Sequence, residues 1–267
     1  MKTTTTPALP VESGYSTVNG LDLYYEIYGD GMPLVLIHGG GSTIQSNFSK
    51  VIPLFARSRR VIAVELQAHG RTGDRDADLS FEQDADDVAA LLGNLEVDKA
   101  DVLGFSNGGT TALQLAIRHP EMVHKLILCS ALAKRSGVPD QFWGFMDHAS
   151  LDNMPEALKT AYLEVAPDAG GLQTMHDRDA KRMVHFQDIP DQHIEAIKAP
   201  ALIIIGDRDV ITPDHALELH RQLSGSRLAI LPGGHGEYLG EITTLTPEFR
   251  ESDLAVPMIE KFLSGKE

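Results

Sequence analysis

The chain has 267 residues, of which 42% are hydrophobic, and a formal net charge of −15 at pH 7. A chain of this length and composition can bury one large core, so we expect one domain with an insertion rather than two independent domains. The strong acidic excess argues against nucleic acid or an anionic membrane as a partner.

The N-terminal part of the chain predicts a polar start followed by a hairpin. Residues 1–10 contain four consecutive threonines and no apolar run. We therefore expect neither a secretory signal nor a membrane anchor, and we expect a cytoplasmic location. Residues 11–28 alternate between apolar and polar types around Asn19-Gly20, a dipeptide typical of tight turns, which predicts an antiparallel hairpin.

A glycine-rich loop follows the strand predicted at residues 34–37. The loop reads His38-Gly39-Gly40-Gly41, and consecutive glycines allow a backbone to approach a substrate closely. The alternative is a flexible turn without a role in binding.

The next segments predict a strand at residues 61–64 and a helix at residues 81–95, whose apolar residues recur at helical spacing. His69 lies between these two elements. We expect it to form hydrogen bonds within a loop rather than to act in catalysis.

A short motif marks the candidate nucleophile. Residues 104–108 read Gly-Phe-Ser-Asn-Gly, after the apolar run 100–103 and before a predicted helix at 109–117. A strand that reverses directly into a helix needs small residues on both sides of the turn, because larger side chains would collide. The serine at the tip of such a turn is exposed. Ser106 is therefore the candidate nucleophile, and the alternative is a serine in an ordinary turn.

Two backbone amides are predicted to stabilise the negative charge that grows on a carbonyl oxygen when Ser106 attacks. One is the amide of Asn107, at the start of the predicted helix. The other belongs to the loop after His38-Gly39 and is assigned to Gly40.

The alternation of strands and helices stops between residues 131 and 199, where short helices are predicted. The single cysteine, Cys129, lies in the preceding strand, where we expect a buried, inert thiol. The sequence has no Cys/His cluster typical of a structural zinc site.

An acid and a histidine follow the serine in the chain. A serine hydroxyl needs a histidine to take its proton and an acid to orient that histidine. The aliphatic run 201–205 predicts a buried strand followed by Asp207 and Asp209, and the next predicted strand is followed by His235. Carboxyl ends of parallel strands meet at one edge of a sheet, so these residues can meet Ser106. Asp207 and Asp209 compete for the role of the acid.

These motifs resemble those of the α/β-hydrolase superfamily over nearly the whole chain. The resemblance rests on residues 38–41, 104–108, 206–209 and 234–236. It extends to capped bacterial enzymes that include enol-lactonases, carbon-carbon bond hydrolases, cofactor-free haloperoxidases and small esterases. It implies an α/β fold with a mainly parallel, doubly wound sheet of about eight strands and a helical cap inserted after strand six.

The resemblance also implies domains and roles. Residues 1–130 and 200–267 would form the core, and residues 131–199 the cap that roofs the nucleophile. In the family the acid falls three residues after the glycine, which selects Asp209, and the position of His38 braces the loop. The cap residues expected to line the substrate pocket are Phe142, Trp143, Met146, Met183 and Phe186. For each of them the alternative is packing against the core.

Two segments depart from the family pattern. Ala68 stands where members carry the first glycine of a Gly-x-Gly turn, and residues 237–251 are longer than the expected link before the last helix, at 254–263. The second departure leaves the size of the pocket open.

The predicted enzyme is a serine hydrolase that cleaves a small carboxylic ester or lactone through an acyl-enzyme, with Ser106, His235 and Asp209 as catalytic residues and no cofactor or metal. Alternatives with the same residues are acyl transfer to hydrogen peroxide and carbon-carbon bond cleavage beside a ketone. A ligand-binding protein without turnover is a third alternative. Haloalkane or epoxide chemistry is disfavoured, because members that perform it have Asp at the position of Ser106. The sequence does not determine the oligomeric state, and a homo-oligomer is among the states considered.

The charge of the substrate depends on Arg182. This residue lies seven positions after Met175 in a predicted helix, so it is a candidate to bind a substrate carboxylate. We favour instead a surface ion pair with a neighbour such as Asp179. The net charge would repel an anionic substrate at long range. The expected substrate is therefore neutral.

Overall fold

The computed structural model describes residues 9–246, 249–250 and 254–265. Within them eight strands form one sheet, in the order β1-β2-β4-β3-β5-β6-β7-β8. The strands are β1 (Glu12–Val18), β2 (Leu21–Tyr28), β3 (Met32–Ile37), β4 (Arg59–Glu65), β5 (Ala100–Phe105), β6 (Val123–Cys129), β7 (Ala201–Gly206) and β8 (Arg227–Leu231). The predicted sheet is confirmed.

The sheet is antiparallel at one edge and parallel elsewhere. β1 pairs with β2 and β2 with β4 in antiparallel register, whereas β3 to β8 pair in parallel. Asn19 and Gly20 join β1 to β2 with φ angles of 47° and 78°, as a two-residue hairpin turn requires. Parallel strands need crossover connections, which the helices supply.

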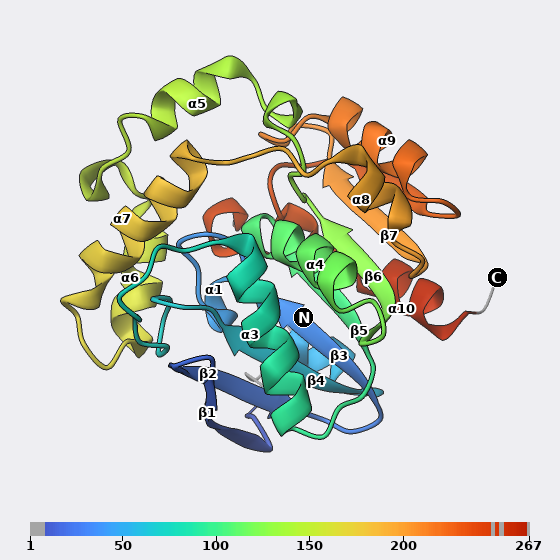
Figure 1. Ribbon diagram of the computed structural model, residues 1–267, viewed down its shortest axis with the longest axis horizontal. Coiled ribbons are helices and arrows are strands. Elements are labelled where there is room, and N and C mark those ends of the chain that lie inside the picture. The colour runs from blue at the N-terminus through green and yellow to red at the C-terminus, as the bar shows by residue number, and fades with distance from the viewer. Residues whose placement is uncertain (1–8, 247–248, 251–253, 266–267) are drawn as a thin grey trace.

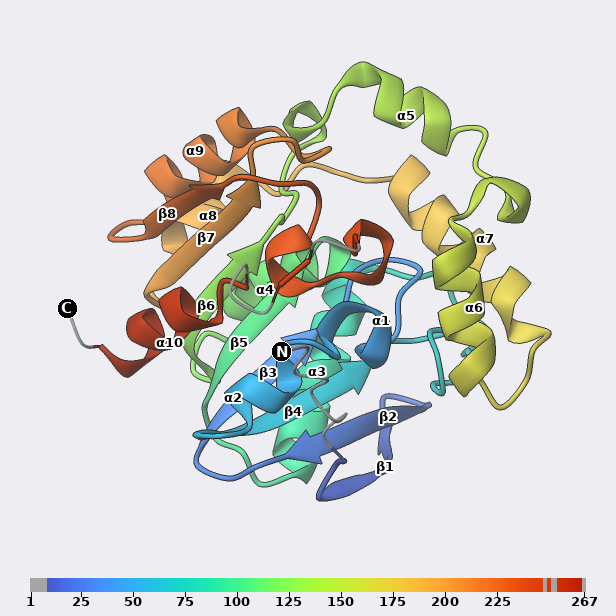
Figure 2. The ribbon, with the colours of Figure 1, turned by 180° about the vertical axis from the view of Figure 1, so that it is seen from behind.

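Helices cover both faces of the sheet (Figures 1 and 2). One face carries α3 (Phe81–Asn94), α4 (Asn107–Arg118), α8 (Asp191–Ala196) and α9 (Pro213–Gln222), and the other carries α1 (Ile44–Phe48), α2 (Ile52–Phe55) and α10 (Val256–Ser264). A separate cluster of buried apolar residues lies on each face. The doubly wound arrangement is therefore confirmed.

The central strands are apolar throughout because both faces are covered. In β3, Leu34 and Leu36 belong to one apolar cluster, and Val35 and Ile37 belong to the other. All four side chains are fully buried. Burial of each such side chain contributes about 2 kcal/mol to the free energy of unfolding.

A helical segment connects β6 to β7. It contains α5 (Asp140–Met146), α6 (Glu156–Val165) and α7 (Gly171–Val184), short 3-10 turns at Arg135–Gly137 and Leu151–Asn153, and finally α8. In Figure 1, α5, α6 and α7 form an arc beyond the carboxyl ends of the strands. This is the end of the sheet at which loops after β3, β5, β7 and β8 come together.

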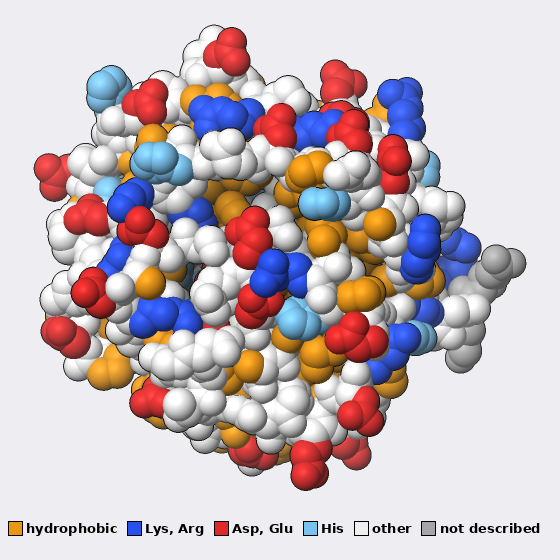
Figure 3. All heavy atoms as spheres, in the orientation of Figure 1, with side chains coloured by type: hydrophobic (Ala, Val, Ile, Leu, Met, Phe, Trp, Pro, Cys, Tyr) orange, Lys and Arg blue, Asp and Glu red, His pale blue; other side chains and the backbone are white. Residues whose placement is uncertain are grey.

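Acidic side chains are spread over the surface. Figure 3 shows Asp and Glu interspersed with Lys and Arg on one face of the molecule. In the part of the chain that the structure describes, no helix is both long and apolar enough to cross a membrane.

Candidate active site

Ser106 lies at the sharp turn between β5 and α4. Its backbone has a φ of 54° and a ψ of −122°, a combination that residues other than glycine rarely adopt. A Cβ on Gly104 would lie 2.1 Å from the Gly108 carbonyl oxygen, and a Cβ on Gly108 would lie 2.2 Å from the Ile37 carbonyl oxygen. Only glycine fits at both positions, so the sequence motif follows from the tightness of the turn.

Ser106, His235 and Asp209 form a continuous line of hydrogen bonds. His235 Nε2 lies 2.9 Å from Ser106 Oγ, and His235 Nδ1 lies 2.7 Å from Asp209 Oδ1. Ser106, His235 and Asp209 follow β5, β8 and β7, and in the sheet β7 and β8 are neighbours while β6 separates them from β5. The Phe105 ring, 4.8 Å from that of His235 between centroids, packs beside the imidazole.

Asp209 is held as a carboxylate. Its side chain has no exposed surface, and it accepts hydrogen bonds from Ser130 Oγ at 2.6 Å and from the Ile211 N–H at 3.0 Å. Burial opposes the charged form, but the hydrogen bond and charge of His235, together with these two bonds, outweigh it. The pKa of Asp209 therefore lies below its ordinary value.

Asp207, the competing acid, accepts a hydrogen bond from the Gly233 N–H at 2.9 Å and does not contact His235. The sequence did not identify two supporting residues. Ser130 donates to Asp209, and Tyr238 Oη lies 2.7 Å from Ser130 Oγ.

The segment 237–251 is longer than the link that the family pattern predicts. It begins with the 3-10 turn Glu237–Leu239, in which Tyr238 and Leu239 are buried. A second short turn follows at Ile242–Thr244. Residues 247–248 and 251 lie outside the described residues, and the effect of this segment on the pocket stays a prediction.

The loop after β3 passes close to Ser106. A Cβ on Gly39 would lie 3.1 Å from Ser106 Cβ. The amides on either side of Gly40 are occupied, because one donates to Asn47 Oδ1 at 2.7 Å and the other to His69 Nε2 at 3.1 Å. The Gly40 N–H itself has no hydrogen-bond partner among the described residues. It is therefore available to a bound group.

Asn107 is the first residue of α4, where the amide has no acceptor within the helix. Its side chain is also occupied, since Nδ2 donates to Asp179 Oδ1 at 3.2 Å. The role of the Asn107 and Gly40 amides in stabilising an oxyanion stays a prediction.

Two buried histidines support this loop. His38 Nε2 accepts the Leu66 N–H at 3.0 Å, and His69 Nε2 accepts the Gly41 N–H. Their ring centroids are 4.9 Å apart. Burial and the neighbouring His69 lower the pKa of His38 to about 3, so its ring is neutral. Both residues are hydrogen-bonding partners of the backbone, as predicted.

The five predicted pocket residues all belong to, or pack against, one buried apolar cluster. Trp143 packs against Phe142 and Phe186, with ring centroids 5.0 and 5.8 Å apart. Met183 belongs to the buried apolar cluster on the α3 and α4 face. Met146 lines the cavity described next. Contact of any of them with a substrate stays a prediction.

A cavity of about 200 Å³ opens beside the loop after β3. Residues of α5, α6, α7 and the glycine loop line it: Gly40, Gly41, Phe145, Met146, Ala149, Asn153, Met154, Pro155, Leu158, Met175, His176, Asp179 and Ala180. One end of the cavity therefore reaches Gly40, next to Ser106. Met154 and Leu158 are four residues apart in the sequence, a spacing that predicts an apolar helix face but not this cavity.

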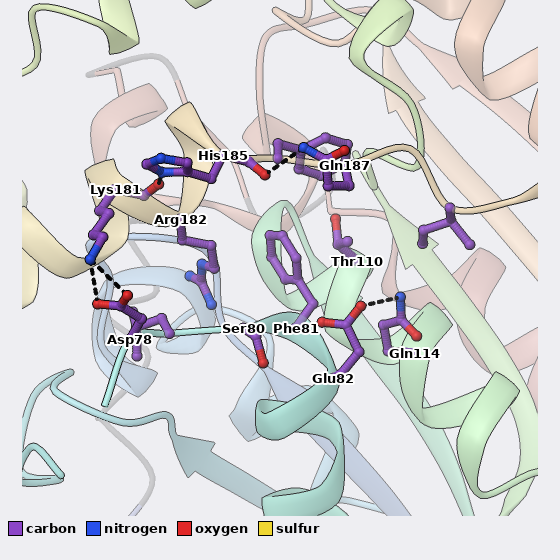
Figure 4. Close-up of a pocket in the computed structure, with 13 residues that line it drawn as sticks. Asp78, Ser80, Phe81, Glu82, Thr110, Gln114, Lys181, Arg182, His185 and Gln187 are labelled. Carbon is purple, nitrogen blue, oxygen red and sulfur yellow. Dashed lines mark hydrogen bonds and ion pairs between the residues drawn. The ribbon is translucent and has the colours of Figure 1, made fainter. Parts of the chain in front are cut away.

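A second cavity, of about 320 Å³, lies further along α7, beside the first turns of α3 and α4. Figure 4 shows that several of its polar groups pair with one another, such as Lys181 with Asp78 and Gln114 with Glu82. Phe186 lines it. Neither cavity is lined by Ser106, His235 or Asp209. The cavity at Gly40 reaches the glycine loop that passes Ser106, which makes it the better candidate for substrate binding.

Arg182 is buried, and the predicted surface location is wrong. Its NH1 lies 2.6 Å from Asp84 Oδ2, and its NH2 contacts Asp179 Oδ1, so the predicted partner is confirmed. The guanidinium carbon lies 4.5 Å from the centre of the Phe81 ring. The start of α3 supplies Asp84 and Phe81, which cover the side chain. A guanidinium shared by two carboxylates has little free charge for a substrate carboxylate.

Cys129 is buried, and burial raises the pKa of its thiol, which makes it inert as predicted. No group of three or more His, Cys, Asp or Glu side chains in the described ranges is placed to hold a metal ion.

Comparison with known proteins identifies relatives of the chain. A sequence model of the alpha/beta hydrolase fold family matches residues 32–174. The chain is 40% identical to the 2-hydroxymuconate semialdehyde hydrolase of Pseudomonas sp. (strain CF600), over only 44% of this chain and 44% of that protein. It is 30% identical to a pimeloyl-[acyl-carrier protein] methyl ester esterase of Neisseria meningitidis serogroup C, over 81% of this chain and 91% of that protein.

A solved structure shows the same fold. The meta-cleavage product hydrolase from Pseudomonas fluorescens IP01 matches with a TM-score of 0.78 and 21% identity, over 97% of this chain and 99% of that one.

Proposed function

Because this chain belongs to the alpha/beta hydrolase fold family, we propose that it is a serine hydrolase of small carboxylic esters or lactones. The observation that supports this proposal is the line of hydrogen bonds from Ser106 through His235 to Asp209. In this line the serine is the nucleophile, the histidine the general base, and the carboxylate orients the histidine.

The reaction proceeds in two steps. His235 takes the proton of Ser106 while the oxygen attacks the carbonyl carbon, and it then gives the proton to the leaving alcohol, which leaves an acyl-enzyme. Water resolves the acyl-enzyme with His235 again as the base. The amides of Gly40 and Asn107 bind the oxyanion, and each such donor stabilises the transition state by about 3 kcal/mol.

The substrate enters under a cap formed by residues 131–199, which covers the core formed by residues 1–130 and 200–267. The apolar cavity at Gly40 supports a small acyl group, and the pairing of Arg182 with two carboxylates argues against a substrate carboxylate. The name of the neisserial relative, a methyl ester esterase, supports an ester. Carbon-carbon bond hydrolysis is the second candidate, supported by the name of the pseudomonad relative.

The nucleophile can be tested directly. A fluorophosphonate probe should label Ser106, and p-nitrophenyl esters of short acyl chains should be hydrolysed. Ser106→Ala and His235→Ala should each lower kcat by on the order of 10⁴, and the double variant should be hardly slower than either single variant, because the two groups act as a unit. EDTA should leave the activity unchanged.

Multiplicative losses in the double variant, or labelling that persists in Ser106→Ala, would contradict this assignment. Slow or absent labelling of the parent protein would favour a ligand-binding protein instead.

A further inference from the structure

The cavity beside Gly40 presents one acid among the described residues that line it. This acid is Asp179 of α7, whose side chain is 13% exposed. Most other side chains of the lining are apolar, such as Met146, Leu158 and Met175. A carboxylate in an apolar wall is unfavourable unless a partner offsets its burial, so its surroundings indicate which groups the cavity accepts.

The two oxygens of Asp179 differ. Oδ1 accepts hydrogen bonds from Asn107 Nδ2 and from Arg182. Oδ2 accepts none from the described residues, and His69 Nε2 lies 3.9 Å away. That nitrogen already accepts the Gly41 N–H, so it holds no proton for Oδ2. Oδ2 therefore keeps its lone pairs for a group in the cavity.

Oδ2 also lies next to the proposed oxyanion donor. A Cβ on Gly40 would lie 2.3 Å from this oxygen, so the carboxylate packs directly against Gly40. An acyl group whose carbonyl oxygen binds the Gly40 N–H would have its first carbons beside Asp179.

The surroundings of Asp179 carry an excess of negative charge. Arg182 is shared with Asp84, so one cation faces two carboxylates. Burial raises the pKa of Asp84 to about 6, and both carboxylates are ionised at higher pH. In a buried site with a low dielectric constant, this charge attracts a cation and repels an anion more strongly than it would in water.

We propose that Asp179 is a specificity-determining residue that binds a protonated amine on the acyl part of the substrate and disfavours a carboxylate there. The ammonium group donates a hydrogen bond to Oδ2, and the apolar side chains contact the remaining carbons. This inference rests on the proposed serine-hydrolase function and names the substrate class within it.

Three methyl esters of similar shape test the proposal at about pH 8. Methyl 3-aminopropanoate carries the ammonium group, methyl butanoate is its neutral counterpart, and monomethyl butanedioate carries a carboxylate. Values of kcat/KM are measured by acid release for the parent protein, Asp179→Asn and Glu164→Gln. The last variant makes the same change in net charge at an exposed position of α6.

In Asp179→Asn, the kcat/KM ratio of the ammonium ester to the neutral ester should fall at least about tenfold from its parent value, and the ratio of the carboxylate ester to the neutral ester should rise. Glu164→Gln should leave both ratios unchanged. Comparison of ratios between proteins cancels the different intrinsic reactivities of the esters. An equal loss for all three esters in Asp179→Asn would mean that the residue is purely structural and would overturn the proposal.

The parent protein provides a second measurement that does not depend on folding of a variant. 3-Aminopropanol should inhibit hydrolysis of methyl butanoate at a concentration at least about tenfold lower than 1-butanol does. Equal inhibition overturns the role of Asp179 and leaves the serine-hydrolase function intact. If Ser106→Ala still hydrolyses methyl butanoate, or if the parent hydrolyses none of the esters, the proposed function itself fails and this inference fails with it.

Discussion

Asp207 and Asp209 stand two residues apart, yet only Asp209 contacts His235. We expect Asp209→Asn to lower kcat by on the order of 10³ to 10⁴, because an amide leaves His235 in the wrong tautomer. Asp207→Asn should change kcat less than about threefold, since Asp207 contacts a loop amide and Arg208 and not His235. Steady-state kinetics on a p-nitrophenyl ester, with circular dichroism as a control for folding, would measure both. The reverse ranking would refute the choice of Asp209.

The residues of the site differ in whether they could be predicted from the sequence. Ser106 and His235 each lie in a short motif, so the residues next to them in the sequence are enough to identify them. Ser130 and Tyr238 support Asp209 from other parts of the chain, and no local pattern marks a serine or a tyrosine for this role. Supporting contacts of this kind depend on tertiary packing, which one sequence does not display.

The turn between β5 and α4 depends on Gly108. We expect Gly108→Ala to lower the free energy of unfolding by about 3 kcal/mol or more, because its Cβ would lie 2.2 Å from a carbonyl oxygen. The displaced loop after β3 should also reduce kcat. Gly93→Ala is the matched control, since Gly93 is exposed in α3 and a Cβ there meets no atom within 4 Å.

Gly93→Ala should raise the free energy of unfolding by about 1 kcal/mol, because alanine favours the helix. Urea unfolding of both variants measures the two effects. A Gly108→Ala protein as stable as Gly93→Ala would mean that the turn is looser than these distances indicate.

Elements were predictable where the pattern is local. Apolar runs predicted the buried strands, and the end of the strand and helix alternation predicted short helices between residues 131 and 199. The face that each of these helices turns toward the glycine loop was not predictable, because it depends on how the whole segment sits on the sheet. Arg182 illustrates the difference. Its partner Asp179 is three residues away in the sequence, whereas the burial of Arg182 depends on Asp84 of α3, which is far away in the sequence.

Ala68 shows a departure from the family pattern that the fold tolerates. It has a φ of 64°, a conformation that favours glycine, and its side chain is buried with Tyr162, Leu172 and Met175. Packing against α6 and α7 offsets the strain of the backbone. The Ala68 side chain thus packs the core against the helical segment.

At the scale of the whole molecule, His38 supports the loop that carries Gly40 and makes the free energy of unfolding depend on pH. This histidine is fully buried and neutral, with a pKa lowered to about 3 from the ordinary value of 6.5, because burial and the neighbouring His69 disfavour its charged form. Between these two pH values the unfolded chain binds a proton at His38 and the folded protein does not. The free energy of unfolding therefore falls as the pH decreases below about 6.5.

Removal of this titration should flatten the pH dependence of stability. At pH 5 the proton bound by the unfolded chain at His38 lowers the free energy of unfolding by about 2 kcal/mol. His38→Asn should be less stable than the parent at pH 7.5, because it loses hydrogen bonds to the loop, but the difference should shrink by about 2 kcal/mol at pH 5. His193→Gln, at an exposed position, should follow the parent. Urea unfolding at the two pH values measures the difference, and a constant gap would show that His38 is not the group that couples this loop to acid.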